Sequence, residues 1–180
     1  MFWRKKLKNS LKISSKTRLI VTCAFFVAMA FVLSLMKIFA MPMGGSVTLA
    51  SVPLIIVSIV HGPFYGLACA AVLGILKIFT SGHIIGWSQA VLDYPLAYAA
   101  FAIAGFCPRK SIVATIFITM AAFLVKTALH VFSGYLFFSG NLNASLAYNL
   151  YYSVPEMALC CVAVYAIVKN GAIFKIDAGR

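Results

Sequence analysis

The chain has 180 residues, of which 63% are hydrophobic and 10% are charged, and its formal net charge is +12. This composition excludes an ordinary soluble globular domain and indicates an integral membrane protein. Seven of the fifteen bases lie in residues 1–18, directly before a long apolar run. A basic segment can bind nucleic acid, but this position favours a cytoplasmic anchor, so we expect a lipid bilayer as its partner and no nucleic acid.

The chain contains six apolar stretches, and about 20 apolar residues are enough for a helix to cross a bilayer. In chain order they cover about 19–39, 47–60, the run from a turn at 61–63 to 80, 88–106, 112–138 and 145–168. The sequence therefore predicts an all-α integral membrane protein, a six-transmembrane-helix bundle. We expect a basic cytoplasmic segment over 1–18, a membrane domain over 19–170 and a cytoplasmic tail over 171–180.

The bases outside the first segment predict how the bundle is oriented. Six crossings return the C-terminus to the side of the N-terminus, and bases lie on that side at Arg109, Lys110, Lys169, Lys175 and Arg180. The three opposite loops, 40–46, 81–87 and 139–144, contain no Lys or Arg. Because cytoplasmic loops are enriched in bases, both termini are predicted to be cytoplasmic and the chain to lie in the cell membrane.

Three polar residues are expected at similar depth in the outer half of the membrane. At a rise of 1.5 Å per residue, Asp93, His130 and Asn149 lie roughly 9, 12 and 6 Å below the outer ends of their spans. The loop above them supplies His83 and Trp87. Each group could be satisfied locally, by a backbone carbonyl or a helix neighbour, but ionisable groups in membranes usually face an interior or a substrate path. The set predicts a pocket open to the outside.

Two opposite charges are expected deeper in the membrane. Lys126 and Glu156 each lie roughly 18 Å from the outer end of their helices, so they can form a structural ion pair. Alternatively, Lys126 belongs to the pocket floor and helps to keep Asp93 ionised. Lys126 and His130 are four residues apart and so share one helix face.

The pocket residues indicate the charge of a ligand. A buried carboxylate with few cations beside it attracts a positively charged molecule, and aromatic faces can stack on a flat ring or a cation. We therefore expect a small cationic aromatic solute, with Trp87 and Tyr94 as the preferred aromatic contacts of Asp93. The other aromatic candidates, which could also be ordinary interfacial anchors, are Phe138, Tyr148 and Tyr151.

The chain shows no catalytic machinery. It lacks a Walker A loop, G-x-S-x-G, H-E-x-x-H and neighbouring carboxylates, so we expect no enzyme activity, no cofactor and no metal site. Ala24 and Ala28, in contrast, form a small-x-x-x-small pair through which another helix can approach closely. The sequence thus predicts a binding protein with a helical partner.

Three motifs resemble those of the substrate-binding S components of energy-coupling-factor vitamin transporters, in the thiamine-specific branch. They are "GGSVTLASVPL" (44–54), "SQAVLDYPLAYAAFAIAG" (88–105) and "LVKTALHVFSG" (124–134), in that order, within a similarity over about 18–170. The resemblance implies a six-helix bacterial membrane protein that binds thiamine from outside. It also implies docking onto a transmembrane coupling subunit driven by two cytoplasmic ATPases.

The resemblance also implies roles for individual residues. Asp93 stands where the family has a carboxylate facing the thiazolium, and Tyr94 follows it; Ala24 and Ala28 match the motif that contacts the coupling subunit. Further pocket positions match at His83 in the loop, Lys126 and His130 in the fifth span, with His130 near the aminopyrimidine, and Asn149 in the sixth.

Two positions depart from the family pattern. Phe138 stands where some relatives have tryptophan, and Ala144 where a tyrosine is expected, although Tyr148 or Tyr151 could replace that phenol from a nearby turn. These departures leave thiamine phosphates, an analogue or another vitamin open as ligands. An autonomous cation- or proton-coupled carrier using Asp93, His130 and Glu156, and a structural assembly factor without a ligand, remain alternatives from other classes.

Overall fold

The computed structural model describes residues 15–108 and 111–171, and most of the predicted segments 1–18 and 171–180 lies outside this part. The long helices are α2 (Ser15–Leu35), α4 (Pro63–Thr80), α7 (Ile112–Ser133) and α8 (Leu142–Lys169). A short hairpin, β1 (Phe39–Ala40) and β2 (Ser46–Val47), is followed by the helix α3 (Ser51–His61). The described chain is thus a helical bundle with one small hairpin inserted.

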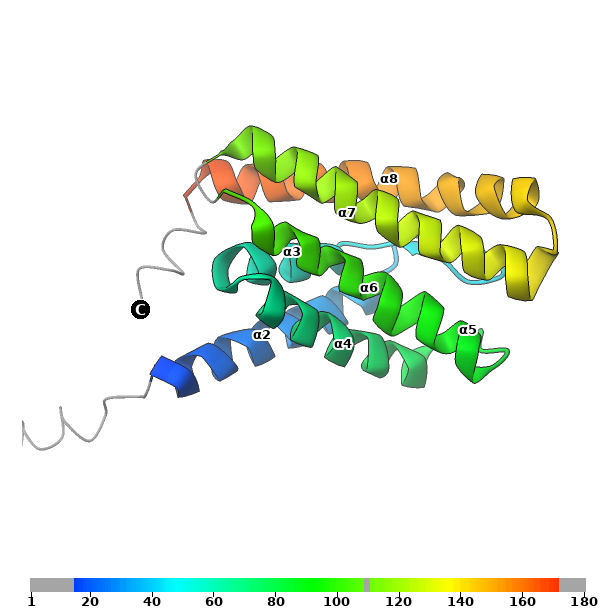
Figure 1. Ribbon diagram of the computed structural model, residues 1–180, viewed down its shortest axis with the longest axis horizontal. Coiled ribbons are helices and arrows are strands. Elements are labelled where there is room, and N and C mark those ends of the chain that lie inside the picture. The colour runs from blue at the N-terminus through cyan, green and yellow to red at the C-terminus, as the bar shows by residue number, and fades with distance from the viewer. Residues whose placement is uncertain (1–14, 109–110, 172–180) are drawn as a thin grey trace, which may run out of the picture.

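The helices form a bundle in which α3 is central (Figure 1). α7 and α8 lie side by side, and α3 packs against α2, α4, α8 and the helical run that precedes α7. The start of α2 and the end of α8 lie at one end of the bundle, whereas the loop that follows α4 and the turn into α8 lie at the other.

Four helical segments are long and apolar enough to cross a membrane, namely Ser15–Leu35, Pro63–Thr80, Ile112–Ser139 and Leu142–Lys169. Large apolar side chains on these segments point outward, among them Phe25, Phe64, Phe79, Phe117 and Val162. An apolar exterior around polar interior groups is typical of a protein whose solvent is lipid. The chain is therefore a helical membrane protein, and its six crossings and cytoplasmic termini stay predictions.

The second predicted span, 47–60, is shorter than expected. α3 has 11 residues, which at 1.5 Å each gives about 16 Å, about half the hydrocarbon thickness of a bilayer. The β1–β2 hairpin takes up the preceding residues, and Gly44 and Gly45 turn it with φ of 93° and 82°. Ten of the eleven α3 residues are buried, so this helix is apolar because other helices surround it.

The fourth predicted span, 88–106, is helical but irregular. It consists of α5 (Trp87–Val91), the π-helix η1 (Leu92–Leu96), α6 (Ala97–Ala99) and the 3₁₀-helix η2 (Ala100–Phe106). Pro95 lies inside η1, and a proline removes a backbone donor and crowds the preceding turn, which the wider π turn accommodates. The same π turn holds Asp93 and Tyr94.

A glycine on α4 allows η1 to pack closely. A Cβ added at Gly74 would overlap the backbone of Pro95, so only a glycine lets the two segments come this near. Since Pro95 follows Asp93 by two residues, this contact sets how far η1 stands from α4. The position of Asp93 therefore depends on Gly74 having no side chain.

Candidate ligand-binding site

One cavity of about 720 Å³ opens among the β1–β2 loop, α4, η1, α7 and α8. Its volume lies within the range of about 300–1,000 Å³ that small-molecule pockets occupy. Both polar and apolar side chains line it, and its polar residues come from segments far apart in the sequence. The bundle thus brings the polar groups of the spans to one internal space.

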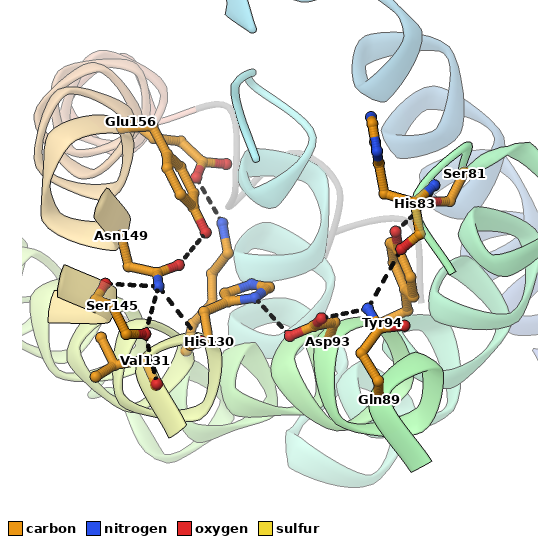
Figure 2. Close-up of polar contacts among 12 residues, drawn as sticks. Ser81, His83, Gln89, Asp93, Tyr94, His130, Val131, Ser145, Asn149 and Glu156 are labelled. Carbon is orange, nitrogen blue, oxygen red and sulfur yellow. Dashed lines mark hydrogen bonds and ion pairs between the residues drawn. The ribbon is translucent and has the colours of Figure 1, made fainter. Parts of the chain in front are cut away.

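Asp93 is the acid at the centre of this lining (Figure 2). Its Oδ1 lies 3.2 Å from Nδ1 of His130, and its Oδ2 accepts a hydrogen bond of 2.5 Å from Nε2 of Gln89. The side chains of Asp93 and His130 are 14% and 16% exposed. The acid therefore points into the cavity rather than at lipid, and its partners are an imidazole and a neutral amide.

Gln89 is a site residue that sequence reasoning missed. It is buried on α5, one helical turn before Asp93, and it binds both the acid and the loop above. Its Oε1 accepts from the backbone N–H of Ile85 at 3.1 Å, and its Nε2 lies 3.4 Å from the carbonyl oxygen of His83. The four-residue spacing from Asp93 was the available signal, because residues four apart share a helix face.

The α4–α5 loop closes one side of the cavity. Ser81 and His83 both line the cavity, and the Ser81 hydroxyl is hydrogen-bonded to the Tyr94 hydroxyl. The backbone N–H of His83 donates to Ser81 Oγ at 3.3 Å. Tyr94 thus has its hydroxyl tied to the loop while its ring lies in the cavity wall beside Asp93.

Asn149 is held by bonds within the protein. Its Nδ2 donates to the carbonyl oxygens of Ser145 and His130 at 2.9 and 3.3 Å, and its Oδ1 accepts from the Tyr152 hydroxyl at 2.7 Å. This agrees with the local interpretation of Asn149, yet the residue also lines the cavity. Its amide therefore fixes α8 against α7 at the cavity wall.

Lys126 and Glu156 form an ion pair at the cavity floor. Lys126 Nζ lies 2.5 Å from Glu156 Oε2, and the two side chains are 6% and 2% exposed. Ser51 Oγ on α3 donates to Glu156 Oε1 at 3.4 Å. The contact agrees with the structural ion pair, and both charged residues also line the cavity. The positive charge of Lys126 is nevertheless directed at Glu156 and not at Asp93.

Tyr148 lines the cavity from α8, as Tyr152 does, whereas Tyr151 does not. The Tyr148 hydroxyl donates to the Gly44 carbonyl oxygen at 2.7 Å and accepts from the Met43 N–H at 3.0 Å, so it fastens the β1–β2 loop to α8. Tyr151 is exposed and packs against Phe39 on the other side of the hairpin. Ala144, where a tyrosine is expected, also lines the cavity, and Tyr148 supplies a phenol one turn further along the same helix.

Seven of the eight residues predicted for the pocket line this one cavity, namely His83, Asp93, Tyr94, Lys126, His130, Phe138 and Asn149. Trp87 does not line it, because its side chain at the start of α5 is 82% exposed. Ala24 and Ala28 lie on α2, away from the cavity, and are exposed on the face opposite the buried Phe26 and Ala30. Their contact with a ligand or a partner stays a prediction.

The fold and the cavity together define a helical membrane protein with a partly open, partly polar ligand cavity among its helices. The chain belongs to the family described as "Thiamine transporter protein (Thia_YuaJ)", whose model matches residues 20–175. It is similar to the thiamine transporter ThiT of Bacillus subtilis (strain 168), with 27% identity over 168 residues, 81% of this chain and 87% of that protein.

A solved structure of ThiT from Listeria monocytogenes has the same fold. It superposes with a TM-score of 0.80 and covers 89% of this chain and 99% of its own, at 19% sequence identity. This likeness confirms the helical membrane fold that the sequence predicted. The irregular 87–106 run and the short α3 therefore belong to a fold that is known from experiment.

Proposed function

We propose that this chain is the substrate-binding subunit of an energy-coupling-factor transporter, which captures thiamine from outside the cell. Membership of the thiamine transporter family supports the ligand. The observation on which the proposal depends is Asp93, an acid that faces a cavity and, within residues 15–108 and 111–171, has only an imidazole and a neutral amide as partners. A carboxylate in this setting favours a cationic ring, and the thiazolium of thiamine is one.

The surrounding groups suit the rest of the vitamin. Tyr94 and Phe138 offer aromatic faces in the cavity wall, against which flat heterocycles stack. His130 lies beside the acid and can exchange hydrogen bonds with the edge of the aminopyrimidine, as the motif resemblance implies. Asn149 acts mainly by holding His130 and Tyr152 in place, because its amide is already bonded to the protein.

Calorimetric titration of the purified full chain with thiamine tests this proposal. Asp93→Asn preserves shape and removes the charge. Opposite charges about 4 Å apart attract each other by roughly 4 kcal/mol at an effective dielectric constant of about 20, so we expect the affinity to fall by about 100-fold. Lys16→Gln, on the exposed start of α2, is the control and leaves the affinity unchanged. Undiminished binding by Asp93→Asn contradicts the role given to the acid.

Uptake is proposed to need a coupling subunit and two cytoplasmic ATPases. The exposed pair Ala24 and Ala28 on α2 supports a docking face, because small residues let another helix approach closely. Replacing both by Leu is expected to abolish ATP-driven thiamine uptake in vesicles that contain all subunits and to leave thiamine binding unchanged. Uptake by the wild-type chain alone, without ATPases, would instead identify an autonomous carrier.

A further inference from the structure

Two lysines in the cavity wall have no role in the site described above. Lys37 follows α2, and Lys77 lies in the last turn of α4; both line the same cavity as Asp93. With the proposed orientation, both lie near the outer face, where the connecting loops contain no Lys or Arg. The positive-inside rule gives no reason for bases at this position, so they need a local explanation.

Neither ammonium has an ion-pair partner in the described part of the chain. Within residues 15–108 and 111–171, neither Lys37 nor Lys77 has a carboxylate at ion-pair distance, and the two acids of that part of the chain are engaged elsewhere. Asp93 interacts with His130 at 3.2 Å, and Glu156 with Lys126 at 2.5 Å. The cavity therefore contains two ammonium groups that form no ion pair within the described residues.

This excess is unexpected in a site for a simple cation. Lys77 is half-buried and close enough to Lys37 to be repelled by its charge, whereas Glu156 attracts Lys77 and Lys126 repels it. Two ammonium groups in the wall of a cavity oppose the entry of any molecule that is only positive. The arrangement is favourable if the bound molecule also has an anionic group.

The packing of α4 against η1 brings the segments that hold Lys77 and Asp93 together in the wall of one cavity. Gly74, one helical turn before Lys77, contacts the backbone of Pro95, which follows Asp93 by two residues. A ligand whose cationic ring faces Asp93 therefore has Lys77 and Lys37 within the same cavity, on the α4 and α2 side. The wall thus offers a negative group and a pair of positive groups to a single small molecule.

We propose that Lys37 and Lys77 form an anion subsite that binds the phosphate of a phosphorylated thiamine, while Asp93 faces the thiazolium. This inference rests on the proposed thiamine-binding function. A phosphate monoester has a charge of about −1.5 to −2 near pH 7 and three strong acceptor oxygens, and lysine binds phosphate as a point charge. The negative charge of the phosphate is matched by the two ammonium groups of Lys37 and Lys77, and the single positive charge of the ring is matched by the Asp93 carboxylate.

Titration of the purified full chain in lipid-free detergent, with thiamine and thiamine monophosphate as separate probes, tests the subsite. We expect Lys37→Gln/Lys77→Gln to weaken binding of the monophosphate by about tenfold or more, because each lost contact is a charge-assisted hydrogen bond. Thiamine binding should stay unchanged or tighten, since a repulsive charge is removed. Lys37→Arg/Lys77→Arg should retain monophosphate binding, and Lys16→Gln should change neither.

Three results would overturn the subsite. The first is an unchanged monophosphate affinity in the double glutamine variant; the second is an equal loss for both probes. The third is a wild-type chain that loses its monophosphate binding in nanodiscs of anionic phosphatidylglycerol but keeps it in nanodiscs of neutral lipid, which would assign the lysines to lipid headgroups.

If the double variant does not fold, as judged by circular dichroism, Lys37→Gln and Lys77→Gln alone should each weaken monophosphate binding about threefold. A wild-type chain that fails to bind thiamine would refute the proposed function instead.

Discussion

The apolar core around α3 and the polar cavity are stabilised in different ways. α3 contributes Leu54, Ile55, Val57 and Val60, all without exposed surface, to a core that is almost purely apolar. The cavity wall instead contains ionisable and amide groups that bond to one another. In lipid, where apolar association of helices has little driving force, the first region relies on close packing and the second on paired polar groups.

The largest expected effect on stability comes from breaking the Lys126–Glu156 ion pair in the cavity lining. Glu156→Leu leaves the buried Lys126 without its partner, and breaking a buried ion pair costs about 3–5 kcal/mol. We expect the free energy of unfolding, measured by denaturant titration in detergent, to fall by about this amount. The double variant Lys126→Met/Glu156→Leu should recover most of it, because neither charge is then left unpaired.

The matched change in the core is Leu54→Ala. It should lower the free energy of unfolding by about 2–3 kcal/mol, because packing contacts are lost and a void remains, and it should leave the thiamine affinity of the folded chain unchanged. A larger loss for Leu54→Ala than for Glu156→Leu would show that the ion pair contributes little to the fold.

A smaller effect is expected where the two regions meet, at the contact of α4 with η1. Gly74→Ala forces the backbone at Pro95 outward, and overpacking of this kind costs about 1–3 kcal/mol. Because Asp93 moves with η1, we expect thiamine affinity to fall by about tenfold, as measured by calorimetry. Gly86→Ala is the control, since a Cβ there meets nothing within 4 Å; equal affinities for both variants would show that η1 does not position the acid.

The smallest expected effect concerns Trp87. Its side chain is exposed and outside the cavity lining, so Trp87→Phe should change the thiamine affinity less than about twofold. A loss of tenfold would indicate that Trp87 contacts the bound ligand, as the sequence predicted. Calorimetry serves here better than tryptophan quenching, because the fluorescence of an exposed indole reports on the loop as well as on binding.

Residue type and position along the chain predicted the cavity better than they predicted the helices. The depth argument selected Asp93, His130 and Asn149 because ionisable and amide groups in lipid need partners, and these groups do share one cavity. Hydropathy could not separate α3, which is apolar because it is enclosed, from a helix that faces lipid. It also could not show that Pro95 converts the 88–106 span into π and 3₁₀ segments.

Contacts between side chains were harder to predict than their depth. The distance from Lys126 to Glu156 follows from how α7 and α8 rotate about their axes, which span counting does not give. Gln89 was overlooked because an amide in an apolar run resembles a helix-packing residue, although its spacing from Asp93 was visible. Trp87 was selected by its nearness in sequence to Asp93, but the helix start directs it away from the cavity.

Gln89 has a consequence for how occupancy of the site and the entrance are linked. One amide bonds the acid through Nε2 and the α4–α5 loop through Oε1, so the carboxylate of Asp93 and the backbone of Ile85 share a single side chain. A bound molecule that draws the amide away from Asp93 also loosens its hold on the loop. Such coupling is reciprocal: if a bound ligand shifts the balance between the open and closed loop by some factor, then closing the loop changes the ligand affinity at Asp93 by the same factor.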